Sequence, residues 1–210
     1  MLPFLSLLLF DQAAAAQPLP TPPRLGIPPK AAPVTGPIEE ITLGPIFRQP
    51  FMCGQHAMGE LDYAGDALGS DCMVVGGVTG ASGYMKPFRT DGKANEDWYG
   101  WHAEVTSPVS GTVLGVLEKP QANVPGTMGP PPAAQIRILT DDGIVIAMAH
   151  LVDFRVKAGD RVTAGQLIAL DGNNGMARNP HVHVGAWRQK DNMPLQIRWD
   201  LRALAATETR

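Results

Sequence analysis

The chain has 210 residues, which is enough for one ordinary domain with extensions but too few for two full domains. Hydrophobic residues make up 44% and charged residues 18%, so the chain can bury a core and is not globally disordered. Because the formal net charge is -3, the surface lacks the basic excess that nucleic acid phosphates require of a partner. Abundant glycine and proline with few aromatic residues favour an all-β fold with many turns.

The N-terminal region predicts an exported protein. Its apolar run from Leu2 to Phe10 is too short to cross a bilayer, which takes a helix of about 20 residues. A small-residue A-x-A site at Ala14 and Ala16 follows this run, as is typical of a secretory signal. We therefore expect residues 1–16 to be a signal peptide. The mature protein is expected to be periplasmic or secreted, with no membrane span after removal of the signal.

Three further segments complete the predicted organisation. Residues 17–45 are rich in proline, which favours extended backbone, and they predict a disordered spacer. Residues 46–201 are expected to form the folded domain and residues 202–210 a tail. The first half of the domain, from Met52 to Tyr99, shows little periodicity, so we expect it to wrap a sheet as irregular structure.

The second half of the domain indicates a mostly antiparallel β-sheet or sandwich. Short runs rich in β-branched or alternating residues are separated by turn signals, and the sequence Asp141-Asp142-Gly143 predicts a hairpin. The long Pro-rich segment 121–134 predicts a loop at the rim of a functional site. The predicted strands are 112–117, 135–139, 144–149, 166–170 and 181–187.

Two histidines stand out in the last predicted strand. His181 and His183 alternate with valine, so both imidazoles point to the same face of a strand. Two adjacent imidazoles are suited to metal binding or acid–base chemistry. The alternative is an exposed polar face of an edge strand, and the H-x-H pattern alone leaves both readings open.

The two cysteines also allow two readings. In an exported protein, Cys53 and Cys72 are expected to form a disulfide. The C-x-x-H spacing of Cys53 and His56 instead allows metal ligation, although the chain has no second C-x-x-C to complete a structural zinc site.

A series of motifs resembles one known family. The resemblance covers about Asp97 to Trp187 and is to the LytM-type zinc endopeptidases of the M23 family, which cut peptidoglycan. It implies a LytM-type fold, similar to a duplicated hybrid motif, with a substrate groove over the sheet. In chain order the motifs are Ser107-Pro108-Val109-Ser110-Gly111-Thr112-Val113, Ala149-His150-Leu151, Val156 to Ala169, Gly172-Asn173-Asn174-Gly175 and Asn179-Pro180-His181-Val182-His183-Val184.

The resemblance also implies a ligand set. His56, Asp66 and His183 would hold a Zn²⁺ ion, and the open fourth position would take a water whose pKa the metal lowers. The family pattern has an Asp four residues after its first His, whereas Asp66 follows His56 by ten residues. Asp62 and Asp97 are therefore competing candidates for the carboxylate ligand.

The resemblance assigns the other two histidines to catalysis. His181 would act as general base and His150 would stabilise the oxyanion of the tetrahedral intermediate. The resemblance thus predicts an exported zinc metalloendopeptidase that hydrolyses peptide bonds in peptidoglycan cross-links. A catalytically inactive protein that binds the cell wall or activates a hydrolase is the alternative. A biotinyl or lipoyl carrier is a poor fit, because the predicted hairpin tip at 141–143 has no lysine.

Overall fold

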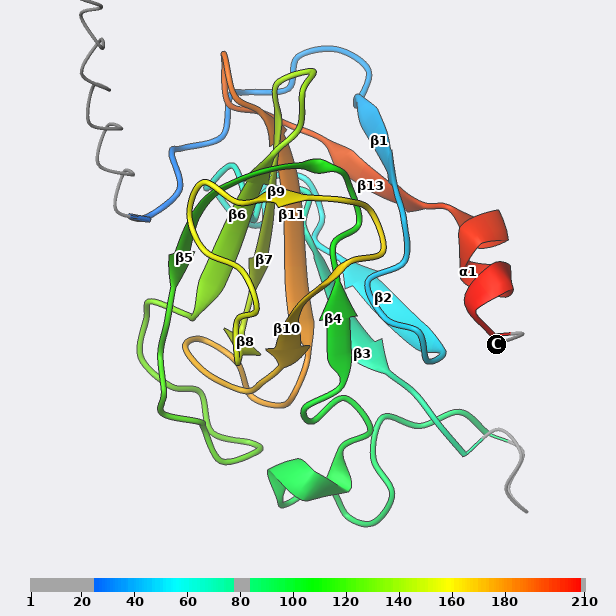
Figure 1. Ribbon diagram of the computed structural model, residues 1–210. Coiled ribbons are helices and arrows are strands. Elements are labelled where there is room, and N and C mark those ends of the chain that lie inside the picture. The colour runs from blue at the N-terminus through cyan, green and yellow to red at the C-terminus, as the bar shows by residue number, and fades with distance from the viewer. Residues whose placement is uncertain (1–24, 78–83, 209–210) are drawn as a thin grey trace, which may run out of the picture.

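The computed structural model describes residues 25–77 and 84–208, and within them β-strands dominate (Figure 1). An eight-stranded antiparallel sheet forms the body of the protein. A three-stranded antiparallel sheet packs on it, and a parallel pair of strands joins the two ends of the domain. These features confirm the predicted all-β, mostly antiparallel fold.

The main sheet contains, in spatial order, β2 (Phe51–Gln55), β3 (Ser70–Val74), β11 (Val182–Arg188), β7 (Ile144–Ala149), β6 (Gln135–Leu139), β5 (Gly111–Leu117) and β9 (Arg161–Val162), with β12 (Met193–Pro194) paired to β11. The small sheet has the order β4 (Glu104–Thr106), β10 (Leu167–Asp171) and β8 (Leu151–Val152). The parallel pair is β1 (Glu40–Leu43) and β13 (Gln196–Trp199).

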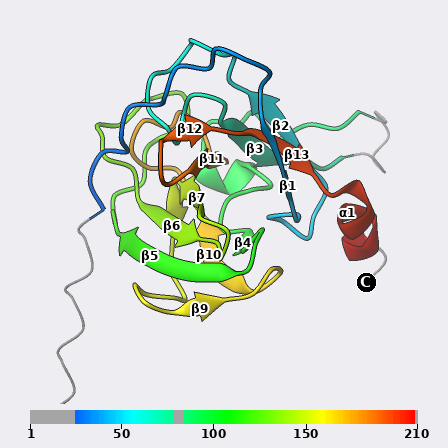
Figure 2. The same ribbon diagram turned by 90° about the horizontal axis from the view of Figure 1, so that it is seen from above.

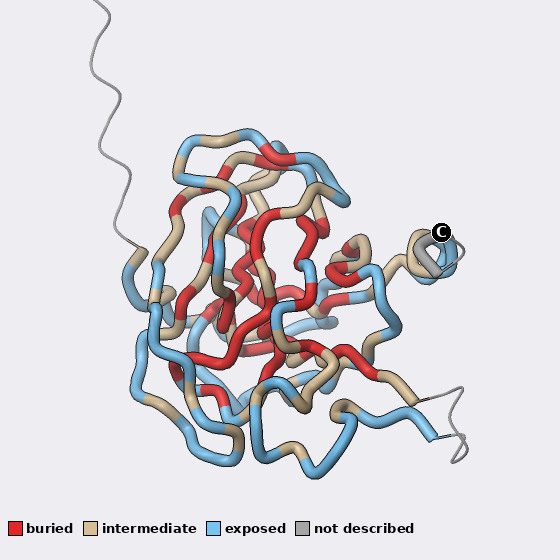
Figure 3. The backbone as a smooth tube through the Cα atoms, turned by 60° about the horizontal axis from the view of Figure 1, so that its bottom comes forward, coloured by how far each residue is buried: buried red, intermediate tan, exposed pale blue. Residues whose placement is uncertain are grey.

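The core lies between the two antiparallel sheets. Branched residues of the main sheet, such as Ile138 and Val184, are fully buried against Val105 and Ile168 of the small sheet. Figure 2, the view from above, shows β4 and β10 close to β6 and β7, and the burial map in Figure 3 places the buried backbone in the interior. The strands predicted for the second half of the domain therefore form because one face of each is apolar.

The first half of the domain differs from its prediction. Residues 52–99 were expected to be irregular, yet β2 and β3 extend the main sheet at the edge of β11. Their own sequences are short and only weakly alternating. β3 pairs with β2 on one side and with β11 on the other. Because β11 lies more than 100 residues further along the chain, local periodicity does not reveal that pairing.

The predicted spacer 17–45 is also corrected in part. Residues 25–45 belong to the folded domain: β1 pairs with β13, and Leu43 is fully buried. Proline removes a donor but leaves its carbonyl, and the carbonyl of Pro29 accepts a hydrogen bond from the Ala64 N–H at 2.8 Å. The predicted signal peptide 1–16, and residues 17–24 after it, lie outside the described residues.

The C-terminal tail begins with a short helix, α1 (Leu201–Glu208), which Figures 1 and 3 show at the outside of the domain. The Asp200 carboxylate accepts the backbone N–H groups of Arg202 and Ala203, each at 3.0 Å, and so caps the helix start. In the described ranges, no helix combines the length and the apolar character needed to span a membrane.

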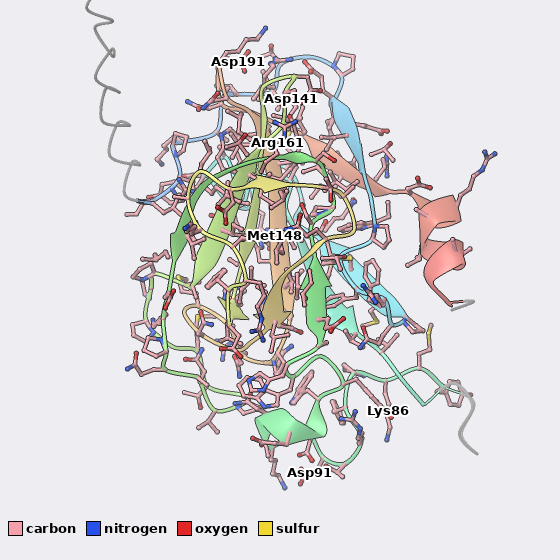
Figure 4. All side chains as sticks on the ribbon, viewed as in Figure 1. Lys86, Asp91, Asp141, Met148, Arg161 and Asp191 are labelled. Carbon is pink, nitrogen blue, oxygen red and sulfur yellow. A yellow bond between two sulfur atoms is a disulfide. The ribbon has the colours of Figure 1, made fainter. Side chains whose placement is uncertain are left out.

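The two ends of the main sheet carry different structures (Figure 4). At one end Arg161 and Asp141 form an exposed ion pair, with Nη1 and Oδ1 2.6 Å apart. The segment of Lys86 and Asp91 lies at the other end, and the buried Met148 lies between. The loops after β3, β5 and β10 gather at this second end (Figure 1).

Candidate metal centre and catalytic histidines

The sheet brings the H-x-H motif and two other strands together. His183 is the second residue of β11, and it pairs with Asp71 on β3 and with Ala149 on β7. His181 lies just before β11, and His150 follows Ala149 directly. His150, His181 and His183 are each only 8% exposed, so they are not the polar face of an edge strand.

Three side chains form a cluster able to hold a metal ion. The ligand atoms of His56, Asp71 and His183 all lie within 4.8 Å of one another. Oδ1 of Asp71 lies 2.8 Å from Nδ1 of His183, and its Oδ2 lies 3.4 Å from Nε2 of His56. Two imidazoles and one carboxylate are a donor set typical of catalytic zinc sites.

Backbone carbonyls hold the opposite nitrogens of both histidines. Nδ1 of His56 is 3.0 Å from the carbonyl oxygen of Asp66, and Nε2 of His183 is 3.0 Å from that of Gly65. Because a carbonyl can only accept, each of these nitrogens carries a hydrogen. The nitrogens that turn toward Asp71 are therefore the ones available to a cation, and the surrounding loop fixes their direction.

The charges of this cluster favour a cation. Burial opposes ionisation of Asp71, but hydrogen bonds from His183 and His56 hold the pKa of its carboxyl well below the usual range. Burial would lower the pKa of His183, yet the Asp66 and Asp71 carboxylates outweigh it and raise that pKa to about 10. The hydrogen bond to Asp71 also raises the pKa of His56. Positive charge is thus stabilised between these side chains.

The other two histidines are in a different environment. Nδ1 of His150 donates to the carbonyl of Asn174 at 2.7 Å, and Nδ1 of His181 donates to that of Asn179 at 2.8 Å. Their rings lie 4.5 Å apart between centroids. Burial lowers the pKa of His150 to about 3 and also lowers the pKa of His181. Both rings are therefore neutral at pH 7, with Nε2 free to accept a proton.

None of the three aspartates considered from the sequence is a member of this cluster. Oδ1 of Asp66 is 3.2 Å from Nε2 of His183, on the ring edge away from Asp71, and Asp66 is not part of the three-residue cluster. Asp62 forms an exposed ion pair with Lys30 at 2.7 Å. The carboxylate of Asp97 accepts hydrogen bonds from the Thr90 hydroxyl and the Ala94 N–H.

The sequence analysis missed Asp71. It directly precedes the apolar run from Cys72 to Val75, which is typical of a short buried strand. Had that run been paired with the strand of the H-x-H motif, an aspartate next to His183 would have been expected. Because the run is short and lies in a Gly-rich region, it was not recognised as a strand.

The cysteine pair forms the predicted disulfide, so the metal-ligand alternative for Cys53 is wrong. Cys53 and Cys72 face each other across the β2–β3 pair. His56 follows β2, and Asp71 precedes Cys72 on β3. The covalent link therefore joins the two strands that bring these members of the cluster to the edge of β11.

Residues 99–195 match the sequence profile of peptidase family M23. The matched range contains His150, His181 and His183 but not His56 or Asp71. Among curated proteins, none matches this chain by sequence.

Several solved structures are similar to the chain at low identity. The SpoIIQ–SpoIIIAH pore forming complex contains a chain 23% identical, with coverage of 49% of this chain and 57% of that one and a TM-score of 0.37. A zinc containing peptidase from Vibrio cholerae is 20% identical, with coverage of 71% and 38% and a TM-score of 0.42. The catalytic domain of lysostaphin from Staphylococcus simulans is 19% identical, with coverage of 71% and 82% and a TM-score of 0.36. The chain thus spans little more than half of the first of these and well under half of the second.

Proposed function

We propose that this chain is an exported zinc metalloendopeptidase that hydrolyses peptide bonds in peptidoglycan cross-links. The main support for the proposal is that two different groups of side chains lie next to each other. A cation-binding cluster lies beside two neutral imidazoles, which is the combination that hydrolysis by an activated water requires. The match of residues 99–195 to peptidase family M23 supports the same activity.

We assign the metal to His56, Asp71 and His183, with Asp71 in place of the Asp66 predicted from the sequence. The donor set fits Zn²⁺, because two imidazoles and a carboxylate leave a tetrahedral position open. When bound, zinc lowers the pKa of a water and polarises the scissile carbonyl. Asp66 then acts from outside the ligand set, where its backbone carbonyl and its carboxylate orient the rings of His56 and His183.

His181 and His150 supply the proton chemistry. Nε2 of His181 lies 3.7 Å from Oδ1 of Asp71, so it is the free imidazole nitrogen beside the metal ligands and serves as general base. The nearby negative charge of Asp71 raises the proton affinity of His181, although burial outweighs it. His150 lies beside His181, and its Nε2 can donate to the oxyanion of the tetrahedral intermediate after it takes up, by way of His181, the proton that the attacking water releases.

An inactive wall-binding or hydrolase-activating protein is less well supported. Such a role needs no ligand set, yet here two histidines and an aspartate converge and both further histidines have hydrogen-bonded rings. Export is proposed from the apolar run and the A-x-A site at the N-terminus.

Zinc content and digestion of purified peptidoglycan test the function. Protein purified without chelator should contain about one zinc per chain, and mass analysis of the digest should show fragments released by peptide bond cleavage. A chain that takes up no metal on titration, or that releases no such fragments while loaded with zinc, is not this enzyme.

Matched variants of the two aspartates test the ligand assignment. Asp71→Asn removes an anionic ligand and should abolish stoichiometric zinc binding. Asp66→Asn keeps the backbone carbonyl and should weaken zinc by at most about 10–100-fold. Zinc retained by Asp71→Asn and lost by Asp66→Asn would restore the set predicted from the sequence.

A further inference from the structure

Asn123 lies in the Pro-rich insert, residues 121–134, and binds the loop that follows β10. Its Nδ2 donates to the carbonyls of Gly175 and Ala177, at 2.9 and 2.8 Å. Its backbone N–H donates to the carbonyl of Asn173 at 2.6 Å. One residue of the insert thus satisfies three carbonyls of residues 173–177, which we call the catalytic loop because its Asn174 holds His150.

Two more asparagines close this network. Nδ2 of Asn95, at the start of η1 (Asn95–Asp97), donates to the carbonyl of Asn123 at 2.9 Å. Oδ1 of Asn95 accepts from Nδ2 of Asn173 at 2.9 Å, and Asn173 is fully buried. Three segments distant in sequence are therefore joined through side-chain amides, at the end of the domain where Figure 1 shows these loops gathered.

The far end of the insert holds the same loop. The Ala134 N–H donates to Oδ1 of the buried Asn174 at 2.8 Å, and Nδ2 of Asn174 donates to the carbonyl of Leu151 at 3.0 Å. The backbone carbonyl of Asn174 is the acceptor for Nδ1 of His150. The direction of that carbonyl, and with it the free nitrogen of His150, depends on contacts that the insert makes on both sides.

We propose that Asn123 is a positioning residue for His150. It holds the catalytic loop so that the Asn174 carbonyl keeps the hydrogen of His150 on Nδ1 and leaves Nε2 for proton transfer. This inference rests on the proposed function for its catalytic consequence. The insert was predicted only as a loop at the rim of the site. Its two ends, at Asn123 and Ala134, also support the catalytic loop.

The effect on rate follows from geometry. Without Asn123, the carbonyls of Gly175 and Ala177 lose their donor, and the catalytic loop can move relative to His150. Displacement of a catalytic group by about 1 Å costs on the order of 10²-fold in rate. The metal ligands His56, Asp71 and His183 lie on other segments, so zinc should stay bound.

The test compares three zinc-loaded variants with the wild-type protein. Asn123→Ala removes the donor, and Asn123→Asp replaces it with an oxygen that faces two carbonyl oxygens. Val124→Ala is the matched control, because Val124 is the next residue and is 66% exposed. The measurements are kcat and KM on the peptide substrate, zinc content, and the nitrogen-15 chemical shifts of the His150 ring, assigned with His150→Gln.

The expected pattern is specific. Asn123→Ala should lower kcat by about 10–100-fold with KM and zinc content unchanged, and Asn123→Asp should lower it further. The His150 ring should shift from one tautomer, with hydrogen on Nδ1, to a mixture. Val124→Ala should behave as wild type. An unchanged His150 tautomer in Asn123→Ala overturns the proposal, as does a change in KM alone or a loss of zinc.

Two provisions keep the outcome interpretable. If Asn123→Ala does not fold, Asn95→Ala keeps the side-chain donor of Asn123 and removes the Asn95 bonds to the Asn123 carbonyl and to Nδ2 of Asn173. It should give a smaller change of kcat and tautomer in the same direction. An unchanged tautomer there also overturns the proposal. If the wild type cleaves no peptide, the proposed function fails, and the nitrogen-15 measurement still decides whether Asn123 controls the His150 ring.

Discussion

The two histidine pairs of the site differ in what surrounds them. His56 and His183 face carboxylates, and their pKa values are raised. His150 and His181 are as buried as His183 but bind backbone carbonyls, and burial lowers their pKa values. Histidine side chains thus have raised pKa values where they face carboxylates and lowered pKa values where they face carbonyls. Charge placed on neighbouring strands makes this difference.

Each half is also held by a different peripheral segment. Residues 57–69, which we call the metal-side loop, bind the rings of His56 and His183 through two backbone carbonyls. Residues 25–34 hold this loop by hydrogen bonds. The carbonyl of Pro29 accepts from the Ala64 N–H, and the Ala31 N–H donates to the backbone carbonyl of Asp62, each at 2.8 Å. The catalytic loop is held by the insert through Asn123. Residues 25–34, which were predicted as part of a spacer, therefore contact the metal-side loop, and the insert, which was predicted as a rim loop, contacts the catalytic loop.

The largest expected effect separates the two members of the H-x-H motif. His183→Ala removes a proposed metal ligand and should yield protein that is poor in zinc and inactive. His181→Ala should keep its zinc and lose about 10²–10⁴-fold in kcat, because it removes the proposed general base. Zinc analysis and turnover measured on the same samples check this. If His181→Ala loses its zinc and His183→Ala keeps it, the two roles are exchanged. If both variants keep zinc and full activity, the motif has no role in catalysis.

A smaller effect is expected from the metal-side loop. A Cβ added at Gly185 on β11 would lie 1.7 Å from the carbonyl oxygen of Gly65, which is the acceptor for His183. Gly185→Ala must displace that carbonyl and should weaken zinc binding by about 10–100-fold. It should leave the His150 tautomer unchanged, because the catalytic loop is held separately.

The matched control for this variant is Gly54→Ala on β2, where an added Cβ meets nothing within 4 Å. Competition with a chelating dye measures the zinc affinity of both variants. Wild-type affinity in Gly185→Ala would show that the Gly65 carbonyl does not orient His183.

The smallest effect concerns stability on the catalytic side. Asp171 ends β10 just before the catalytic loop; it is fully buried, and among the described residues its carboxyl has no side-chain partner. Burial raises its pKa well above the usual value, and a backbone hydrogen bond at Gly172 only partly offsets this. Asp171→Val, similar in volume, should therefore stabilise the protein by about 1–3 kcal/mol at pH 7.

The sign of the pH dependence follows from this shift. The folded protein keeps the Asp171 proton to higher pH than the unfolded chain does. Its favourable contribution is therefore complete below pH 3.8, the ordinary value, and is lost as the pH rises through the folded pKa. Denaturant unfolding of wild type and Asp171→Val at several pH values should show a difference that grows with pH. A difference that does not depend on pH would contradict a raised pKa.

The sequence and the structure agree best where the signal is local. The strands 135–139 and 144–149 were predicted with the bounds that β6 and β7 have, because each is apolar and the Asp141-Asp142-Gly143 turn separates them. The cysteine pair was likewise predicted as a disulfide, and the structure contains it. These features depend on neighbouring residues or on composition.

The sequence by itself thus determined the all-β class, the antiparallel second half and the two histidines at the start of β11 that point to the same side. Only the tertiary structure decided that Asp71 lies against His56 and His183, that residues 25–34 belong to the domain, and that Asn123 reaches the catalytic loop. The physical reason is the range of the interactions. Side-chain alternation repeats every two residues and is visible in a short stretch. The Asp71–His183 contact instead joins residues 112 positions apart, and their meeting depends on the pairing of strands whose own sequences do not specify a partner.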